Sequence, residues 1–369
     1  MAVFSILKNF DNPSWAVGTS NFLSIVKSPL TYTRFGNQTM VYCNFPETIG
    51  PGHLGDTQAD GTPGYCINKA TITTSEALLY VSCNSSCDSP KKLAVRVYNP
   101  NSSTVTITKV NSGFNCTDTW YPQTGAYERF FTDIHMDHPI SAGESVWIEE
   151  ESVMANGRFE ALMKYTISGG SIVMAVYLCT NTVSVSGSPK IVTPTSPNLY
   201  SGTASAFYIS CNHSVSSSTL FSSGNRNSVF YGIAQKKFSG NVTESNPITL
   251  LQGGVASEDS DTYNNIGNYG LQYAFNTTLR NTQSTGRVKF KGYIISNPDS
   301  HCAGITSGGL AKAFFLGTNG AGPGKGYVRW NFCETAYISA GSSITLNYQY
   351  MHLGRGNAPG IIQWEAIKE

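Results

Sequence analysis

Short runs of apolar residues, several of them alternating with polar ones, recur along the whole chain. Thr104–Thr108 alternates with a period of two, and Leu93–Tyr98 is a largely apolar run that ends at Asn99-Pro100. A turn-forming pair between two such runs predicts a β-hairpin. Ile172–Leu178 and Val288–Ile295 are apolar enough to predict buried central strands.

Helical signals are few and short. Arg158–Lys164 and Ala311–Leu316 are the segments whose composition also suits a helix, and both are shorter than the roughly 10 residues expected of a helix in a globular domain. We therefore predict an all-β protein. Its 369 residues are enough for two domains with separate cores, which we expect to be tandem antiparallel β-sandwich or jelly-roll domains.

One stretch of the chain has the composition of a linker. Residues 183–199 contain three prolines and many Ser and Thr residues, which is typical of a connection between domains. We accordingly place the first β-sandwich domain at 41–182 and the second at 200–369. Residues 1–40 then form an N-terminal extension.

The two predicted domains contain similar short sequences. Ile140–Val146 reads ISAGESV and Ile338–Ile344 reads ISAGSSI, while Val97–Pro100 is similar to Ile295–Pro298. A duplicated domain explains both similarities. Chance similarity between sequences that form β-turns is the alternative.

The N-terminal extension carries apolar side chains without an obvious partner strand nearby. Val3, Phe4, Ile6 and Leu7 are its first apolar residues. The extension is either an ordinary first strand or an arm that donates a strand to the sheet edge of a neighbouring copy, where backbone hydrogen bonds supply affinity. In the second case these four residues make the assembly contacts.

Charge is scarce in this chain. Only 13% of the residues are charged and the net charge is +1, so no basic surface indicates a nucleic-acid partner. Low net charge also removes the repulsion that keeps copies apart, which favours self-association. No apolar run of about 18 residues predicts a membrane span. The first residues lack the pattern of a secretion signal, but we expect an extracellular or cell- or spore-surface location from the polar, charge-poor composition.

Cysteine and metal chemistry are weakly indicated. The nine cysteines are irregularly spaced, and Cys83 and Cys87 are close enough in sequence for a local disulfide, with buried thiols as the alternative. His135 and His138 lack a third ligand with suitable spacing. Asp259 and Asp261 lie in an oxygen-rich segment without the EF-hand pattern. We expect no metal and no cofactor.

No sequence motif indicates catalysis. The chain lacks a nucleophile elbow, a zinc-protease helix and a recognisable carboxylate pair, so we do not expect an enzyme and assign no catalytic residue. Trp120 and Tyr121 are an aromatic pair that suits stacking on a sugar ring. They suggest surface polysaccharide as a second partner besides copies of the chain itself.

Several short motifs resemble surface proteins of spore-forming Gram-positive bacteria that are labelled copper-amine-oxidase-like. The residues that carry this resemblance are Phe45–Glu47, Gly50–Gly52, Lys92–Pro100, Val105–Ile107, Gly267–Gly270, Tyr273 and Asn297-Pro298. The resemblance implies a β protein of the cell or spore surface. It does not imply oxidase chemistry, because Asn268-Tyr269 is followed by Gly270 where an acidic residue is required, and no His-x-His copper pair exists.

From these features we expect a structural subunit that assembles with its own copies into an extracellular or spore-surface filament, appendage or coat. Two alternatives stay open. One is a monomeric β-sandwich that binds carbohydrate or another envelope component. The other is a viral structural protein of the jelly-roll type.

Overall fold

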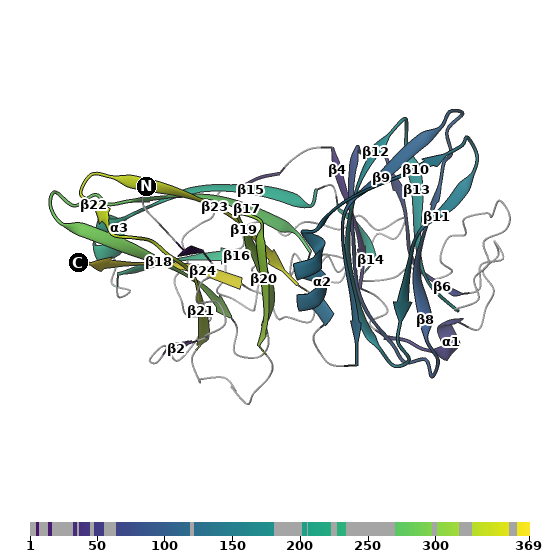
Figure 1. The fold of residues 1–369 in the computed structure, drawn as a ribbon, viewed down its shortest axis with the longest axis horizontal. Coiled ribbons are helices and arrows are strands. Elements are labelled where there is room, and N and C mark those ends of the chain that lie inside the picture. Colours follow the sequence, from purple (N-terminus) through teal and green to yellow (C-terminus); the bar gives the residue numbers. More distant parts are fainter. Residues whose placement is uncertain are drawn as a thin grey trace, which may run out of the picture. The chain divides into compact units, whose positions relative to one another are not determined.

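The computed structural model describes residues 5–6, 14–16, 32–34, 37–44, 48–54, 64–118, 122–180, 201–204, 206–222, 227–233, 270–296, 301–316, 327–353 and 360–369. These residues form strands almost throughout, so the predicted all-β class is confirmed. They divide into two compact units (Figure 1). Unit 1 comprises Met1–Arg34, Tyr208–Pro247 and Ile266–Glu369, and unit 2 comprises Phe35–Phe207 and Ile248–Asn265.

Unit 2 is a sandwich of two sheets. One sheet has the order β10-β9-β12-β7-β4-β14, with β5 beside β7, and the other has the order β11-β8-β13-β6 (Figure 1). The elements of unit 2 are β4 (Gln38–Cys43), β5 (Thr48–Ile49), α1 (Pro51–Leu54), β6 (Gly64–Ile72), β7 (Glu76–Ser85), β8 (Lys91–Tyr98), β9 (Val105–Thr117), α2 (Pro122–Phe130), β10 (Asp133–Ile140), β11 (Ser145–Val153), β12 (Arg158–Ser168), β13 (Ile172–Thr180) and β14 (Ser201–Ala204).

Eight of these strands, β6 to β13, pair in a nested order. β6 pairs with β13, β7 with β12, β8 with β11, and β9 with β10, all antiparallel. The first strand thus pairs with the last and the two middle strands pair with each other, so the paired strands wrap around one core. This is the arrangement of a jelly roll.

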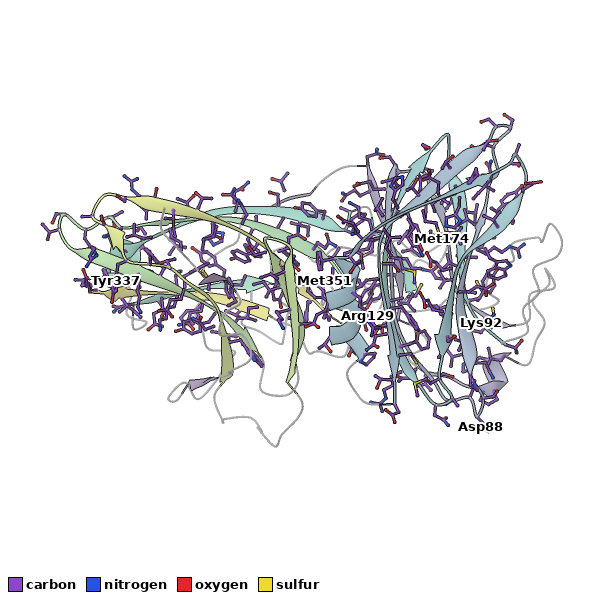
Figure 2. The ribbon with its side chains drawn as sticks, viewed as in Figure 1. Asp88, Lys92, Arg129, Met174, Tyr337 and Met351 are labelled. Carbon is purple, nitrogen blue, oxygen red and sulfur yellow. The ribbon has the colours of Figure 1, made fainter. Side chains whose placement is uncertain are left out.

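The core of unit 2 lies between its two sheets. Alternate residues of β7, including Ala77, Leu79 and Val81, face Val95 of β8 and Met174 of β13 in one hydrophobic cluster. Met174 points into the space between the sheets, as Figure 2 shows. The period-two alternation of a strand places every second side chain on this inner face. The buried strand predicted at Ile172–Leu178 is therefore found in β13.

Unit 1 repeats most of this order. β16 pairs with β24, β17 with β23, and β18 with β21 and β22, all antiparallel. The difference is at β15, which pairs parallel to β17. The strands and the helix of unit 1 are β1 (Ser5–Ile6), β2 (Ser14–Ala16), β3 (Tyr32–Arg34), β15 (Tyr208–Ser216), α3 (Ser217–Ser222), β16 (Ser228–Ile233), β17 (Gln272–Arg280), β18 (Arg287–Ser296), β19 (His301–Ser307), β20 (Leu310–Leu316), β21 (Tyr327–Glu334), β22 (Ile338–Ser339), β23 (Ser343–His352) and β24 (Gly360–Lys368).

One local prediction is wrong. The Asn99-Pro100 turn does not close a hairpin, because β8 and β9 belong to opposite sheets of the sandwich. The segments that also suited a helix, Arg158–Lys164 and Ala311–Leu316, lie in strands β12 and β20. Pairing with neighbouring strands on both sides explains β12, because a central strand satisfies all of its backbone groups in the sheet.

Asn99 explains why the chain turns from one sheet to the other at this point. Its side chain is fully buried, and Nδ2 donates to the carbonyl of Ile140 at 2.9 Å. Its backbone N–H donates to Glu144 at 2.9 Å and its carbonyl accepts from Gly143 at 3.0 Å. Oδ1 accepts from the backbone N–H of Asn101 at 2.9 Å. This asparagine therefore joins the β8–β9 connection to the β10–β11 turn.

Asn281 makes the same contacts in unit 1. It is also fully buried, and its Nδ2 donates to the carbonyl of Ile338 at 2.9 Å. Its backbone N–H donates to Ser342 and its carbonyl accepts from Gly341, each at 2.9 Å. Oδ1 accepts from the N–H of Gln283 at 3.1 Å.

The two asparagine corners account for the similarity between ISAGESV and ISAGSSI. Gly143 and Gly341 have φ angles of 74° and 73°, a left-handed conformation that favours glycine. Equivalent turns in equivalent places support the duplicated-domain interpretation. The second predicted similarity does not follow this equivalence, because Ile295 lies in β18, the counterpart of β9, whereas Val97 lies in β8.

The predicted N-terminal extension is divided between the units. β1 and β2 pair with β21, and β3 pairs with β15, all in unit 1. β4 pairs in parallel with β7 of unit 2. The predicted linker, 183–199, lies outside the described residues, and the donation of a strand to a neighbouring copy stays a prediction.

Candidate functional site

A cluster of ionisable side chains lies between the two sheets of unit 2, at the edge formed by β10 and β11. We call Lys109, His138, Glu149, Glu151 and Tyr165 the edge cluster. They come from four strands: β9, β10, β11 and β12. Because β10 and β11 end their respective sheets, this cluster closes the side of the sandwich.

A β-bulge turns the acidic residues of β11 toward the interior. Trp147 is opposite Arg96 of β8 and Glu149 is opposite Val95, so Ile148 is an extra residue in this ladder. Beyond a bulge the side chains change faces relative to the unbroken alternation. Glu149 consequently shares the inner face with Val95, which belongs to the core.

A second irregularity brings Lys109 to the same place. In the ladder between β9 and β12, Lys164 is opposite Asn111 and Tyr165 is opposite Lys109, so Val110 is the extra residue of β9. Lys109 is also opposite Met136 of β10. The lysine therefore lies on the inner face, beside the fully buried Tyr165.

Glu149 is the centre of the edge cluster. Lys109 Nζ lies 2.9 Å from Glu149 Oε2, and the two side chains are only 12% and 3% exposed. The Tyr165 hydroxyl donates to Glu149 Oε1 at 2.9 Å. Both carboxylate oxygens are thus engaged. This arrangement stabilises a charge at the edge, and it leaves neither oxygen available as a general base.

Burial changes the protonation of the groups around Glu149. It raises the pKa of Tyr165 well above its usual value, and the negative charge of Glu149 raises it further. Burial likewise raises the pKa of the Glu151 carboxyl, with Glu149 adding to the effect and Lys109 opposing it. Burial lowers the pKa of His138, against the attraction of Glu149. Its Nε2 is enclosed and has no hydrogen-bond partner.

The predicted metal candidates are not gathered into a site. His135 is exposed on β10 and lies 3.7 Å from Asp137, while His138 faces the sandwich interior beside core residue Ile107. Asp259 and Asp261 lie outside the described residues. Within the described part of the chain, no group of three His, Cys, Asp or Glu side chains is arranged to hold a metal ion.

The predicted disulfide between Cys83 and Cys87 is not formed. Both residues are buried thiols. Cys83 Sγ lies 3.9 Å from the carbonyl oxygen of Cys43, and Cys87 Sγ lies 3.7 Å from that of Ile49. The two thiols therefore point to different acceptors. They pack as small apolar side chains, which was the alternative interpretation.

The remaining predicted site residues are not tested. Trp120 and Tyr121 lie just before α2, outside the described residues. The same holds for Val3, Phe4 and Leu7. Only the backbone of Ile6 is described, in β1, where it is opposite Cys333 of the same chain.

Sequence reasoning missed the edge cluster. Its signal is the run Glu149–Glu151 inside a strand that is otherwise largely apolar. An acidic run in a strand is ordinarily a solvated face, and only the bulge at Ile148, which depends on pairing with β8, directs Glu149 inward.

The exposed apolar side chains lie near turns and sheet edges. Met136 and Met154 are each 47% exposed, Leu310 is 63% exposed and Tyr337 is 37% exposed. Leu310 directly follows Gly308 and Gly309, whose φ angles of 58° and 81° form the turn between β19 and β20. These side chains are candidates for contacts with other molecules, since exposed apolar groups favour association.

The comparisons with known proteins leave the chain without an assigned family. No family model matches it, and no curated protein matches it. Among solved structures, broad bean stain virus is similar at 10% identity over 76% of both chains, with a TM-score of 0.15. The CUB1–EGF–CUB2 domain of human MASP-1/3 is similar at 9% identity over 81% of this chain and 99% of the other, also with a TM-score of 0.15.

A xanthan lyase from Paenibacillus is similar at 10% identity over 97% of this chain and 27% of the lyase, again with a TM-score of 0.15. Likenesses this slight carry no conclusion about fold or function. The resemblance to copper-amine-oxidase-like surface proteins stays a prediction. Within the described residues, no helix is long and apolar enough to cross a membrane.

Proposed function

We propose that the chain is a structural subunit that assembles with copies of itself into a coat or closed shell. The observation that carries this proposal is the nested strand order of unit 2, most of which recurs in unit 1. Eight-stranded jelly rolls of this kind form viral capsids, lectin domains and cupins.

The packing of unit 2 argues against the cupin class. Fully buried Val95, Met163 and Met174 belong to one continuous cluster between the sheets. A binding barrel of the cupin type places its ligand between the sheets, in the space that side chains fill here. Contacts with partners must therefore come from the outer faces, edges and turns.

The edges of unit 2 favour an ordered assembly over indiscriminate strand pairing. β10 contains Pro139 and the charged Asp133 and Asp137, and β11 contains a bulge and the inward charge of Glu149. Prolines, bulges and inward charges are the features by which proteins prevent edge strands from pairing with other molecules. Copies that meet through defined turns and faces form closed symmetric assemblies more readily than open stacks.

The low charge of the chain is consistent with this proposal. A net charge of +1 over 369 residues gives little repulsion between copies. Weak repulsion between copies would equally suit a filament or appendage subunit, or a spore-surface coat. An extracellular or cell-surface location stays a prediction. Recognition of polysaccharide by Trp120 and Tyr121 also stays a prediction.

The proposal is tested by the mass of the purified full-length chain in solution. Size-exclusion chromatography with multi-angle light scattering is run over a hundredfold range of concentration at neutral pH. The proposal predicts a defined multimer whose mass is a fixed multiple of 39.8 kDa. A species of 39.8 kDa at every concentration contradicts it.

A matched pair of surface variants shows whether such an assembly is specific. Leu310→Glu replaces the most exposed large apolar side chain of the described residues, which is 63% exposed, with a charged one. Lys312→Glu changes the charge two residues further along the same strand. If the turn between β19 and β20 contributes to assembly, Leu310→Glu lowers the assembled fraction more than Lys312→Glu does. Equal effects would assign the assembly contacts to other surfaces.

A further inference from the structure

His213 lies in a mostly apolar part of unit 1, on the inner side of β15. Its Nε2 is 3.3 Å from Thr277 Oγ1 of β17. The ring lies 4.7 Å from that of Tyr231 in β16 and 5.7 Å from that of Phe275 in β17. Its Nδ1 is enclosed and has no hydrogen-bond partner. One side of the imidazole is therefore held by a hydroxyl, while the other meets no polar group.

Among the described residues, no acidic group offsets the effect of burial on His213, whose pKa is lowered by burial alone. Besides Tyr231, the buried titratable groups linked to this contact are Tyr348 on β23 and, next to Tyr348, Cys211 on β15 and Cys333 on β21. Burial raises the pKa of each of these four groups, so all four are neutral in the physiological range. The acidic Glu334 of β21 is paired with Lys289 and Lys291. The hydroxyl of Thr277 is also 3.4 Å from that of Tyr348. His213 is thus connected through the hydroxyl of Thr277 to that of Tyr348, and both hydroxyls are neutral.

The strands that contact His213 are joined by a short connection. β15 leads through α3 to β16, and β16 is at the end of its sheet, where it pairs with β24. α3 is attached to the β17–β18 connection through Ser217, whose hydroxyl lies 3.3 Å from Asn281 Oδ1. A strand at the end of a sheet has hydrogen bonds on one side only, so β16 separates from the sandwich at lower cost than β15, which pairs with both β17 and β3.

We infer that His213 is an acid-sensitive contact whose protonation releases the end strand β16 from unit 1. Protonation adds an N–H donor and a positive charge beside the ring of Tyr231, where the described residues give Nδ1 no hydrogen-bond partner. A buried charge without a partner destabilises the state that buries it. Separation of β16 from its sheet hydrates the imidazolium and removes this cost.

The protonation equilibrium gives the direction of the pH effect. Burial lowers the pKa of His213 from 6.5 to about 4. Because the folded pKa lies below the unfolded one, the unfolded or opened state binds the proton first. The stability that neutral His213 contributes is fully present above pH 6.5, falls as the pH decreases, and is lost by about pH 4. The inference concerns unit 1 alone and does not depend on the proposed assembly.

Hydrogen exchange of the full-length chain at several pH values tests this inference. After correction for the intrinsic exchange rates, we expect peptides from Ser228–Ile233 to lose protection between pH 7 and pH 5. The opening constant rises about 20-fold over this range, because the opened state binds a proton near pH 6.5 and the closed state only near pH 4. Peptides from β12 and β13 of unit 2 provide the internal reference in a His138→Gln background, because burial also lowers the pKa of His138.

The variant His213→Gln removes the titration and keeps a side chain that can reach Thr277. We expect its unit 1 peptides to show less than a threefold change over the same pH range. The matched control is His135→Gln, because His135 is exposed on unit 2; this variant keeps the wild-type response. If His213→Gln does not fold, His213→Phe keeps the contact with Tyr231 and takes its place.

The range from pH 7 to pH 5 separates this effect from that of carboxylates. In unit 1 the pKa of Glu334 is lowered by its hydrogen bond to Lys289, so the stability that it contributes is lost below pH 4.5. Protection of β16 that is constant from pH 7 to pH 5 overturns the inference. A wild-type response in the His213 variant overturns it as well.

Discussion

Asn99 and Asn281 are the residues through which each unit joins its two turns. The side chain of Asn99 satisfies four backbone groups and that of Asn281 satisfies three. Nδ2 and Oδ1 replace hydrogen bonds that the backbone cannot make where the chain passes between sheets. Buried backbone groups without partners are costly. This explains why the same residue type holds both corners, although few other residues are shared between the units.

Replacement of either asparagine by alanine therefore destabilises its unit. We expect Asn99→Ala and Asn281→Ala to lower the free energy of unfolding by about 1–3 kcal/mol for each buried group left without a partner. Urea unfolding, followed by fluorescence and circular dichroism, measures the change. Asn276→Ala is the control, because Asn276 is exposed on β17. Equal stability of all three variants would contradict the proposed role of the corners.

The buried pair of Glu149 and Lys109 permits a sharper test, because Glu150, the next residue of β11, forms a more exposed ion pair. Removing one partner of a buried ion pair costs about 3–5 kcal/mol, so Glu149→Gln and Lys109→Met should each be strongly destabilising. Glu150 pairs with Lys92 at 3.0 Å, with side chains 44% and 26% exposed. Glu150→Gln should cost less than about 1 kcal/mol.

The double variant Glu149→Gln with Lys109→Met distinguishes a true pair from two independent contacts. If the charges compensate each other, the double variant loses less stability than the sum of the two single changes. Additive losses, measured in the same urea experiments, would show that Glu149 and Lys109 act separately.

At the scale of elements, Gly113 determines how closely α2 approaches its sheet. A Cβ atom at Gly113 would lie 2.0 Å from the carbonyl oxygen of Ala126 and 2.6 Å from the backbone N of Phe130. The helix must therefore move if the glycine is replaced. Figure 1 shows α2 beside the sheet that contains β9 and β12.

We expect Gly113→Ala to destabilise unit 2 by about 1–3 kcal/mol, the usual cost of overpacking, and to increase hydrogen exchange in α2. Gly52→Ala is the control, since a Cβ at Gly52 would meet no atom within 4 Å. Thermal unfolding and exchange of peptides from Pro122–Phe130 measure the effects. Unchanged exchange in α2 would mean that the helix does not depend on this close approach.

The strands themselves were largely predictable from sequence, because their period depends on local alternation. The similarity of ISAGESV and ISAGSSI also indicated the equivalent corners before any pairing was known. The β8–β9 hairpin was predicted wrongly, since Asn99-Pro100 suits both a hairpin and a crossing between sheets. Which of the two forms depends on Ile140 and Glu144, which are about 40 residues away in sequence and contact Asn99 only in the folded unit.

The edge cluster and His213 depend on long-range pairing to a still greater degree. Glu149 is directed inward by a bulge that exists only in the ladder with β8, and Lys109 by a bulge in the ladder with β12. His213 follows Cys211 and Asn212 in a polar stretch of β15, so its sequence context gives no sign of the rings around it. Local patterns establish strands, but they do not establish which charges the strands bury.

At the scale of the molecule, the two units suggest a division of roles within one chain. Unit 2 has the complete set of eight nested strands and blunted edges. Unit 1 has three of the nested pairs and a parallel β15–β17 pair, and it contains the acid-sensitive contact. A coat whose subunits combine a firmly closed unit with one that opens in acid would be stable at neutral pH and would loosen during acidification.

Negative-stain electron microscopy of the purified full-length chain at neutral pH is the most direct test of the central claim. Our account predicts closed particles of uniform diameter, built from many copies of the chain. Filaments would support self-assembly but contradict closure. Fields that contain only dispersed single molecules, at concentrations well above the micromolar range, would contradict the proposal that this chain is a coat subunit.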